Sequence, residues 1–263
     1  APIDNFGFAR SHQFNPSYFD PSVTYVPWQN ADGTYFPNAS PTAARVDPRD
    51  ATPTINLTAL RRGDRNNQHR FYVGRDTVLP ANTVVEAGGN CGGLNSTNWT
   101  TLNAARTITA NCQIGIEYFP AVFYLTTDTP APPGFITANR VGPIAHAGGP
   151  NVSMYKYEIR PANYVGGAGG AAYQAAIRNF ANWFTYYGNR SRAMIAGMTQ
   201  SFADVNTLRV GYFTINQRNN VTMRDMAVAA DRSALYDSFL SLPASGGTPN
   251  RQAVQHMGQQ FQR

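Results

Sequence analysis

The stretch IRNFANWFTYYGNRSRAMIAGMTQSF, residues 177–202, indicates how the second half of this chain folds. Large apolar residues recur in it every three or four positions, which is typical of the buried side of an α-helix. These residues are Ile177, Phe180, Phe184, Tyr187, Met194, Ile195, Met198 and Phe202. We expect Gly188-Asn189 to kink the helix, because glycine is a poor residue in a helix interior.

The residues that follow predict a strand and two more helices. Leu208–Ile215, LRVGYFTI, has the apolar run of a buried strand. Asp231 is the expected N-cap of a second helix that ends at Leu242, and Pro249 is expected in the first turn of a third. One strand cannot form a sheet, so partner strands must come from the first part of the chain or from segments outside this sequence.

Residues 1–165 have a different composition, rich in Pro, Gly, Asn and Thr, with short β-prone pieces such as Gly115–Leu125 and Met154–Ile159. The glycine-rich bridge at 165–170 then leads into the helical region. We therefore predict a β-rich, loop-dominated region at 1–165 and a helix–strand–helix–helix region at 166–263. The predicted fold class is α/β in the second region and α+β overall.

Composition argues for an extracytoplasmic protein. Only 14% of the 263 residues are charged, whereas 12% are aromatic, which is the opposite of a disordered chain. The net charge of +6 comes from arginines with a single lysine, Lys156, and a nucleic-acid-binding protein usually clusters its basic residues. Here the arginines are dispersed, apart from Arg61, Arg62, Arg65, Arg70 and Arg75. We expect no nucleic-acid partner, with cytosolic nucleic-acid binding as the alternative, and no apolar run is long enough to predict a membrane span.

Cys91 and Cys112 are the two cysteines of the sequence, and we expect them to form a disulfide in an oxidising compartment. Two unrelated buried thiols are the alternative. A zinc site is not expected, because no CxxC or HxxxH motif accompanies the cysteines.

The sequence does not predict an enzyme. It has no HExxH or GxSxG motif, and its glutamates are Glu86, Glu117 and Glu158. A secreted polysaccharide-acting hydrolase is one alternative, and it requires that the fold bring Glu117 and Glu158 together. Otherwise each of these glutamates is a solvent-facing strand residue or the partner of an arginine.

A carbohydrate-binding module is another alternative, in which aromatic side chains stack on sugars. The candidates are Trp28, Tyr35, Trp99 and Tyr118. More often such residues belong to the core of a loop-rich β protein.

Arg62-Gly63-Asp64 is a candidate receptor-binding triplet in a polar loop. An integrin-type receptor binds the arginine and aspartate of such a triplet as an exposed charge pair, and the aspartate supplies a carboxylate to the receptor's metal. The composition of the chain gives an expectation of roughly a tenth of one such triplet by chance, so a coincidental occurrence is the alternative.

Several segments resemble the PilY family of type IV pilus tip and biogenesis proteins. They occur in that family's order, and together they cover both ends of the chain but not residues 48–150. The segments are Phe14-Asn15-Pro16, Asp20–Trp28 (DPSVTYVPW), Asn30–Asn38 (NADGTYFPN), Phe180–Tyr187 (FANWFTYY), Leu208–Asn216 (LRVGYFTIN) and Leu242–Arg251 (LPASGGTPNR).

The resemblance implies a non-enzymatic surface protein at the pilus tip, on the cell surface or outer membrane, or secreted. Such a protein acts in adhesion and pilus biogenesis, and the implied partners are minor pilins and receptors on host or abiotic surfaces. The implied fold is a partial von Willebrand A-like α/β unit with a large irregular β-rich, disulfide-containing insertion.

The resemblance also implies a divalent cation, calcium or magnesium, with Thr248 as a ligand on the loop between the last two helices. Capping of the third helix is the alternative role of Thr248. The D-x-S-x-S motif that begins such a cation site does not occur in this sequence. We therefore expect an internal fragment with an incomplete site, and missing segments of the chain's own precursor among its partners.

Overall fold

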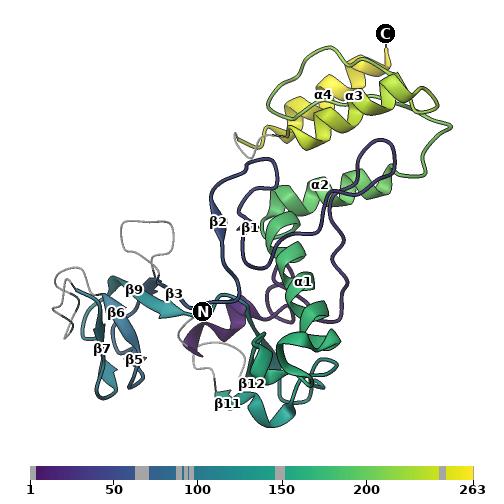
Figure 1. Cartoon of the computed structure of the whole chain (residues 1–263). Coiled ribbons are helices and arrows are strands. Elements are labelled where there is room, and N and C mark those ends of the chain that lie inside the picture. The colour runs from purple at the N-terminus through teal and green to yellow at the C-terminus, as the bar shows by residue number, and fades with distance from the viewer. Residues whose placement is uncertain are drawn as a thin grey trace. The chain divides into compact units, whose positions relative to one another are not determined.

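The computed structural model describes residues 4–62, 71–86, 91, 94, 98–145, 152–242 and 247–262 (Figure 1). Within these residues the fold is mixed α+β, with four α-helices and several small sheets whose strand pairs are all antiparallel. The α+β class expected for the whole chain is confirmed at this level.

Two compact units divide the chain. Unit 1 comprises Ala1–Thr24 and Ala39–Ala181, and unit 2 comprises Tyr25–Asn38 and Asn182–Arg263. Helix α1, Ala171–Tyr186, begins in unit 1 and ends in unit 2. The division expected after residue 165, between a β-rich insertion region and a helical part of a larger domain, stays a prediction.

Unit 1 contains twelve of the strands that the structure describes. They are β1 (Ala44–Arg45), β2 (Thr54–Ile55), β3 (Arg61–Arg62), β4 (Phe71–Val73), β5 (Val78–Leu79), β6 (Val84–Glu86), β7 (Thr100–Thr101), β8 (Arg106–Thr107), β9 (Cys112–Tyr118), β10 (Val122–Thr126), β11 (Val141–Ala145) and β12 (Ser153–Glu158). Short 3-10 helices cover Asp4–Arg10, Thr137–Asn139, Pro161–Asn163 and Gly167–Gly169.

Strand β9 organises the first sheet of unit 1. It pairs with β3, β4 and β6, and β6 pairs in turn with β7. Ile114 and Ile116 alternate along β9 and point into a core that also contains Val85 and Cys91. Glu117 follows Ile116 and is only partly buried, as strand alternation requires.

The second sheet has the order β10-β12-β11. Four of the five residues of β10 are buried, because side chains pack against both faces of this strand. On one face Val122 and Tyr124 pack with Met154, and Phe123 stacks on Tyr157 with ring centroids 5.3 Å apart. The predicted strands at 115–125 and 154–159 are thereby confirmed as β9, β10 and β12.

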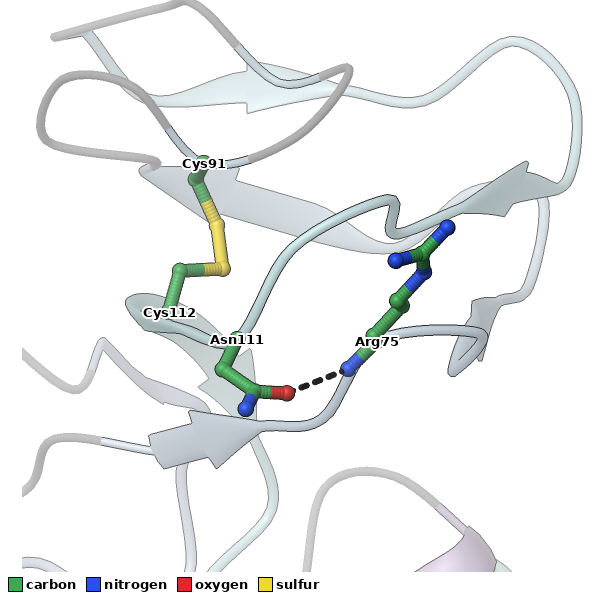
Figure 2. Close-up of a disulfide and its surroundings, with 4 residues drawn as sticks. All are labelled: Arg75, Cys91, Asn111 and Cys112. Atoms are coloured by element: carbon green, nitrogen blue, oxygen red, sulfur yellow. Dashed lines mark hydrogen bonds between the residues drawn. A yellow bond between two sulfur atoms is a disulfide. The ribbon is translucent and has the colours of Figure 1, made fainter.

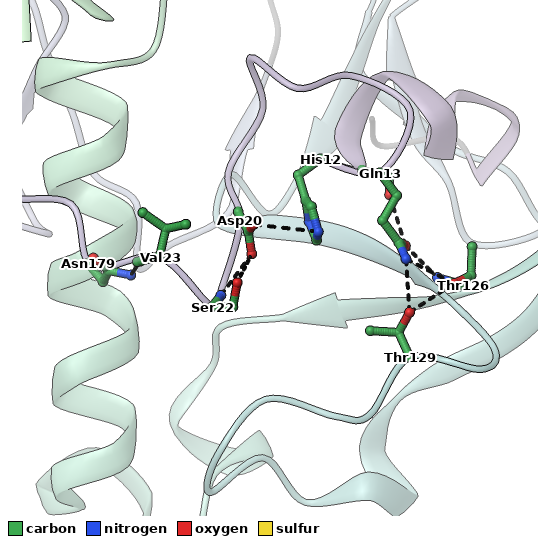
Figure 3. Close-up of polar contacts among 9 residues, drawn as sticks. His12, Gln13, Asp20, Ser22, Val23, Thr126, Thr129 and Asn179 are labelled. Atoms are coloured by element: carbon green, nitrogen blue, oxygen red, sulfur yellow. Dashed lines mark hydrogen bonds and ion pairs between the residues drawn. The ribbon is translucent and has the colours of Figure 1, made fainter. Parts of the chain in front are cut away.

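The first residues of unit 1 are tied to this sheet by side-chain hydrogen bonds (Figure 3). Gln13 accepts a bond from the backbone N–H of Thr126, and its amide donates to the hydroxyls of Thr126 and Thr129, at 2.9–3.0 Å. Asn179 of α1 donates to the carbonyl of Val23 at 2.7 Å. These bonds fix an otherwise irregular segment against regular elements.

Unit 2 contains the C-terminal end of α1 together with α2 (Arg190–Ser201), α3 (Ala229–Leu240), α4 (Asn250–Phe261), β13 (Arg209–Val210) and β14 (Arg224–Asp225). The kink expected at Gly188-Asn189 is a full break between α1 and α2. Asn189 is the N-cap of α2, and its side-chain oxygen accepts a hydrogen bond from the backbone N–H of Arg192 at 2.9 Å.

Two details of the sequence interpretation of unit 2 are wrong. The strand expected at Leu208–Ile215 is limited to Arg209–Val210, which pairs with β14 from the following loop, and Leu208 is 57% exposed. Asp231 is not an N-cap. It lies in the first turn of α3, where its carboxylate accepts a hydrogen bond from the backbone N–H of Asp225 at 2.7 Å.

Candidate functional site

A small pocket in unit 1 brings together both glutamates that the hydrolase alternative requires. Its volume is about 130 Å³. The lining residues are Leu60, Glu117, Tyr118, Phe119, Val122, Lys156, Glu158 and Arg160.

Strand register explains why these residues converge. Glu158 at the end of β12 lies opposite Val122 at the start of β10. Phe119-Pro120-Ala121 connects β9 to β10, so Glu117 near the end of β9 is only five positions from Val122. The pocket therefore forms where the first sheet passes into the second.

Each glutamate accepts a hydrogen bond from an arginine. Arg62 Nε donates to Glu117 Oε2 at 3.0 Å. Arg160 Nε donates to Glu158 Oε2, and Lys156 Nζ lies 3.5 Å from Glu158 Oε1. An acid catalyst of glycoside hydrolysis must direct its carboxyl group at the glycosidic oxygen, whereas one oxygen of each of these carboxyl groups is directed at an arginine. The arrangement suits the binding of a polar ligand better than acid catalysis.

Aromatic rings hold both arginines in place. The Arg62 guanidinium lies over the ring of Trp99, 5.1 Å from its centroid, and the Arg160 guanidinium lies 4.0 Å from the centroid of Phe119. Each arginine is thus fixed by one ring and one carboxylate, which lowers the entropy cost of presenting it to a ligand.

The floor of the pocket is apolar. Tyr118, Phe119 and Val122 are 8%, 4% and 2% exposed. Burial raises the pKa of the Tyr118 phenol above its ordinary value, although the nearby Arg10 lowers it in part. Tyr118 is therefore a neutral hydroxyl at physiological pH and adds no negative charge to the pocket.

The receptor-binding triplet is only partly described. Arg62 lies in β3 with its side chain 54% exposed, and it is already paired with Glu117. Gly63 and Asp64 lie outside the described residues. The exposure of the triplet as a unit stays a prediction.

Thr248 is exposed and lies one residue before Pro249, the N-cap of α4. No side chain caps α4, whose N-cap is Pro249, and the Thr248 carbonyl accepts a hydrogen bond from the backbone N–H of Asn250 at 2.9 Å. The capping role considered for Thr248 is therefore not observed. In the part of the chain that the structure describes, no three His, Cys, Asp or Glu side chains gather as a metal site, so Thr248 is a single candidate ligand rather than part of a set.

The predicted disulfide is confirmed. Cys91 and Cys112 are bonded, with their Cα atoms 5.4 Å apart (Figure 2). Next to Cys112, Asn111 accepts a hydrogen bond from the backbone N–H of Arg75 at 2.8 Å. The disulfide ties β9 to the residues that follow β6 and extends the core of the first sheet.

The four aromatic residues considered as sugar platforms do not form one. Trp28 is fully buried and Tyr118 nearly so, while the Trp99 ring faces Arg62. Tyr35, in unit 2, is the one of the four that is largely exposed, at 52%. Burial satisfies the large apolar area of these rings, as it usually does in loop-rich proteins.

Sequence reasoning missed Lys156, Arg160 and Phe119 as pocket residues. A signal for Lys156 was present, because Lys156 and Glu158 are two positions apart in a predicted strand, which places such residues on one face. Arg160 lies beyond the end of this strand. The role of Phe119 depends on tertiary structure.

Comparisons of the chain with models of protein families, with curated proteins and with solved structures each found no match. Among the described residues, no helix is both long and apolar enough to cross a membrane.

Proposed function

We propose that this chain is a non-enzymatic part of a type IV pilus-associated surface protein, which acts in adhesion and pilus biogenesis by binding proteins or surfaces. The proposal starts from the resemblance to the PilY family. The disulfide is compatible with an extracytoplasmic location, which such a protein requires.

One observation supports the proposal most directly: segments that carry the resemblance pack against one another, although they are far apart in the sequence. Asn182 donates to the carbonyl of Tyr25 at 2.9 Å and to the side chain of Asn38 at 2.8 Å. The hydroxyls of Tyr186 and Tyr187 donate to the carbonyls of Pro37 and Val26, both at 2.7 Å. Three of the six segments, 20–28, 30–38 and 180–187, are thus joined by hydrogen bonds in the folded chain, which an accidental likeness between separate peptides does not require.

We assign the helices of unit 2 to the von Willebrand A-like unit that the resemblance implies. The support is the apolar stretch around β13, where Leu208 and Ile215 are 57% and 36% exposed. Such exposure is expected of apolar residues that additional strands cover in a complete domain. In this proposal the strands come from segments of the precursor outside this sequence. Thr248 would supply one hydroxyl oxygen to a divalent cation, a ligand type that calcium and magnesium accept.

A second candidate function is recognition or hydrolysis of polysaccharide, and the convergence of Glu117 and Glu158 on one pocket favours it. Both carboxylates are engaged by arginines, so the pocket supports recognition more than hydrolysis.

Biolayer interferometry on the purified chain tests these functions. Minor pilins and an integrin ectodomain serve as protein partners, and a panel of polysaccharides is assayed in parallel for release of reducing sugar. We expect saturable binding to at least one protein partner and no sugar release. Sugar release that is lost in Glu117→Gln and Glu158→Gln variants would instead establish the hydrolase.

A further inference from the structure

We propose that the pocket between β9, β10 and β12 binds the uronate unit of an acidic polysaccharide. The inference rests on the surface-binding function proposed above and names a ligand class for it. Three features of the pocket lead to this ligand: a fixed anion-binding group, acceptors for hydroxyls, and an apolar floor of limited size.

Arg160 supplies the anion-binding group. Its Nε atom is bound to Glu158 and its face lies on Phe119, yet neither Nη atom makes a hydrogen bond to a described residue. The side chain is 37% exposed, so the free edge of the guanidinium is accessible. A guanidinium held in this way presents two parallel N–H groups to a carboxylate.

The charge balance around the pocket also favours an anion. Arg62, Lys156 and Arg160 face the two carboxylates of Glu117 and Glu158, which leaves one positive charge in excess. Because Lys156 and Glu158 are only 17% and 22% exposed, their charges are less screened than those of surface groups.

The glutamates can accept hydrogen bonds from hydroxyl groups. Glu117 uses Oε2 for Arg62, and no described residue donates to its Oε1. A carboxylate accepts several bonds and donates none, so the complementary ligand groups are hydroxyls or amines. A uronate carries its carboxylate and several hydroxyls on one ring, and it can therefore use Arg160 and Glu117 together.

Size and floor limit the ligand further. About 130 Å³ accommodates a carboxylate and the ring atoms next to it, but not an oligosaccharide. The apolar floor of Phe119 and Val122 suits the C–H face of a sugar ring. The pocket thus fits one acidic unit that projects from a polymer.

Nuclear magnetic resonance of the full isotope-labelled chain tests the inference, with sodium D-glucuronate, D-glucose and sodium acetate as ligands. We expect saturable shifts of the amide signals of residues 117–122 and 156–160 with glucuronate. Glucose and acetate should bind at least about tenfold more weakly, because glucose lacks the carboxylate for Arg160 and acetate lacks the hydroxyls for Glu117. Equal binding of acetate would reveal a plain anion site and overturn the sugar assignment, and equal binding of glucose would overturn the role of the carboxylate.

Substitutions locate the site. Arg160→Ala should weaken glucuronate binding by at least about tenfold, the scale of one charge-assisted hydrogen bond, and Arg160→Lys should have a smaller effect. Arg49→Ala is the matched control, because Arg49 also pairs with a carboxylate in unit 1, Asp47 at 2.6 Å, but does not line the pocket.

Unchanged binding in a folded Arg160→Ala protein, or no saturable shift in the wild type, would refute the inference. Binding to pilins or an integrin ectodomain is measured on the same samples. If the wild-type chain bound none of these protein partners but bound glucuronate saturably, the proposed function would be refuted and the pocket assignment would stand.

Discussion

The indole Nε1 of Trp28 donates a hydrogen bond to the carbonyl oxygen of Tyr186 at 3.0 Å, across 158 positions of sequence. Tyr186 is the last residue of α1, where carbonyl groups have no partner within the helix. Arg192 Nη1 binds the carbonyls of Phe184 and Thr185 in the same turn, at 2.8 and 2.9 Å. Side chains from before and after the helix thus cap its end, and they stabilise the break between α1 and α2.

Replacing Trp28 should therefore destabilise unit 2. We expect Trp28→Ala to lower the free energy of unfolding by about 3–5 kcal/mol, since the side chain is fully buried. Trp28→Phe keeps much of the volume but loses the hydrogen-bond donor, so about 1–3 kcal/mol is expected. Urea denaturation followed by far-ultraviolet circular dichroism measures both losses.

Trp99→Phe is the control for this series, because Trp99 is only partly buried and keeps an aromatic ring for Arg62 after the substitution. It should cost less than about 1 kcal/mol. If Trp99→Phe and Trp28→Phe destabilised the protein equally, the capping role of Trp28 would be refuted.

Reduction of the Cys91–Cys112 disulfide should loosen the first sheet of unit 1. The two cysteines are 21 positions apart, and closing a loop of this size stabilises a fold by roughly 3 kcal/mol. Hydrogen exchange of the β9 amides, at Ile114 and Ile116, should then accelerate by about two orders of magnitude. Mass spectrometry with and without reductant measures the change, and the double variant Cys91→Ser/Cys112→Ser should reproduce it.

Helix α3 provides the internal reference for this experiment, because Leu235 and Phe239 belong to a separate core in unit 2. Their exchange should be unaffected by reductant. Equal acceleration in α3 would mean that the disulfide stabilises the whole chain and not the first sheet alone.

Local patterns predicted the elements that local physics determines. The apolar spacing predicted the helices. The break between α1 and α2 falls at Asn189, whose side chain caps the start of α2. The β-prone run at 115–125 predicted strands there, and the structure has β9 and β10 in this stretch. The LRVGYFTI stretch led to the prediction of a longer strand than the structure has. An apolar run favours a strand only when partner strands are available to cover it.

The candidate pocket could not be predicted from the sequence. Glu117 and Glu158 meet because β12 pairs with β10 in the register that places Glu158 opposite Val122. A shift of one residue would turn Glu158 to the other face of the sheet. No local signal specifies that register, and the ring that supports Arg160 comes from the connection between two strands.

Glu117→Gln should increase the availability of Arg62 to a receptor. The Arg62–Glu117 ion pair is half exposed, so its loss releases the arginine at a cost of at most about 1 kcal/mol, or up to about fivefold in affinity. Surface plasmon resonance with an immobilised integrin ectodomain measures the gain. Glu86→Gln is the matched control, because Glu86 lies in β6 of the same sheet.

Asp64→Glu should abolish this binding, because the longer side chain misplaces the carboxylate relative to the arginine. Receptor binding that is insensitive to Asp64→Glu would show that the triplet does not mediate it.

Asp32 should titrate below its ordinary pKa of 3.8. Hydrogen bonds from the hydroxyl of Thr34, at 2.7 Å, and then from its backbone N–H, at 2.9 Å, favour the ionised form and lower the pKa. Because the folded-state pKa is the lower one, this contribution to stability is complete above the unfolded-state pKa. It is lost as the pH falls through the folded-state pKa.

Thr34→Val should return the pKa of Asp32 toward its ordinary value, as measured from the carboxyl carbon signal of Asp32 by magnetic resonance. Thr58→Val is the control. Thr58 makes the same turn with the neutral amide of Asn56, its hydroxyl 2.8 Å from Asn56 Oδ1, and should leave Asp32 unchanged. An unaltered pKa in Thr34→Val would contradict the assigned cause.

Substitutions of Thr248 distinguish the proposed role in cation binding from a structural role. Its side chain is exposed and caps no helix, so Thr248→Ala should change the free energy of unfolding by less than about 0.5 kcal/mol. If Thr248 is a ligand, the same substitution should weaken binding of calcium or magnesium in isothermal titration calorimetry, whereas Thr248→Ser should retain it, because serine keeps the hydroxyl oxygen. Thr101→Ala, at another exposed threonine, should alter neither stability nor cation binding. Equal cation affinity in wild type and Thr248→Ala would remove Thr248 from the proposed site, and the surface-binding function would then have to act without a cation at this loop.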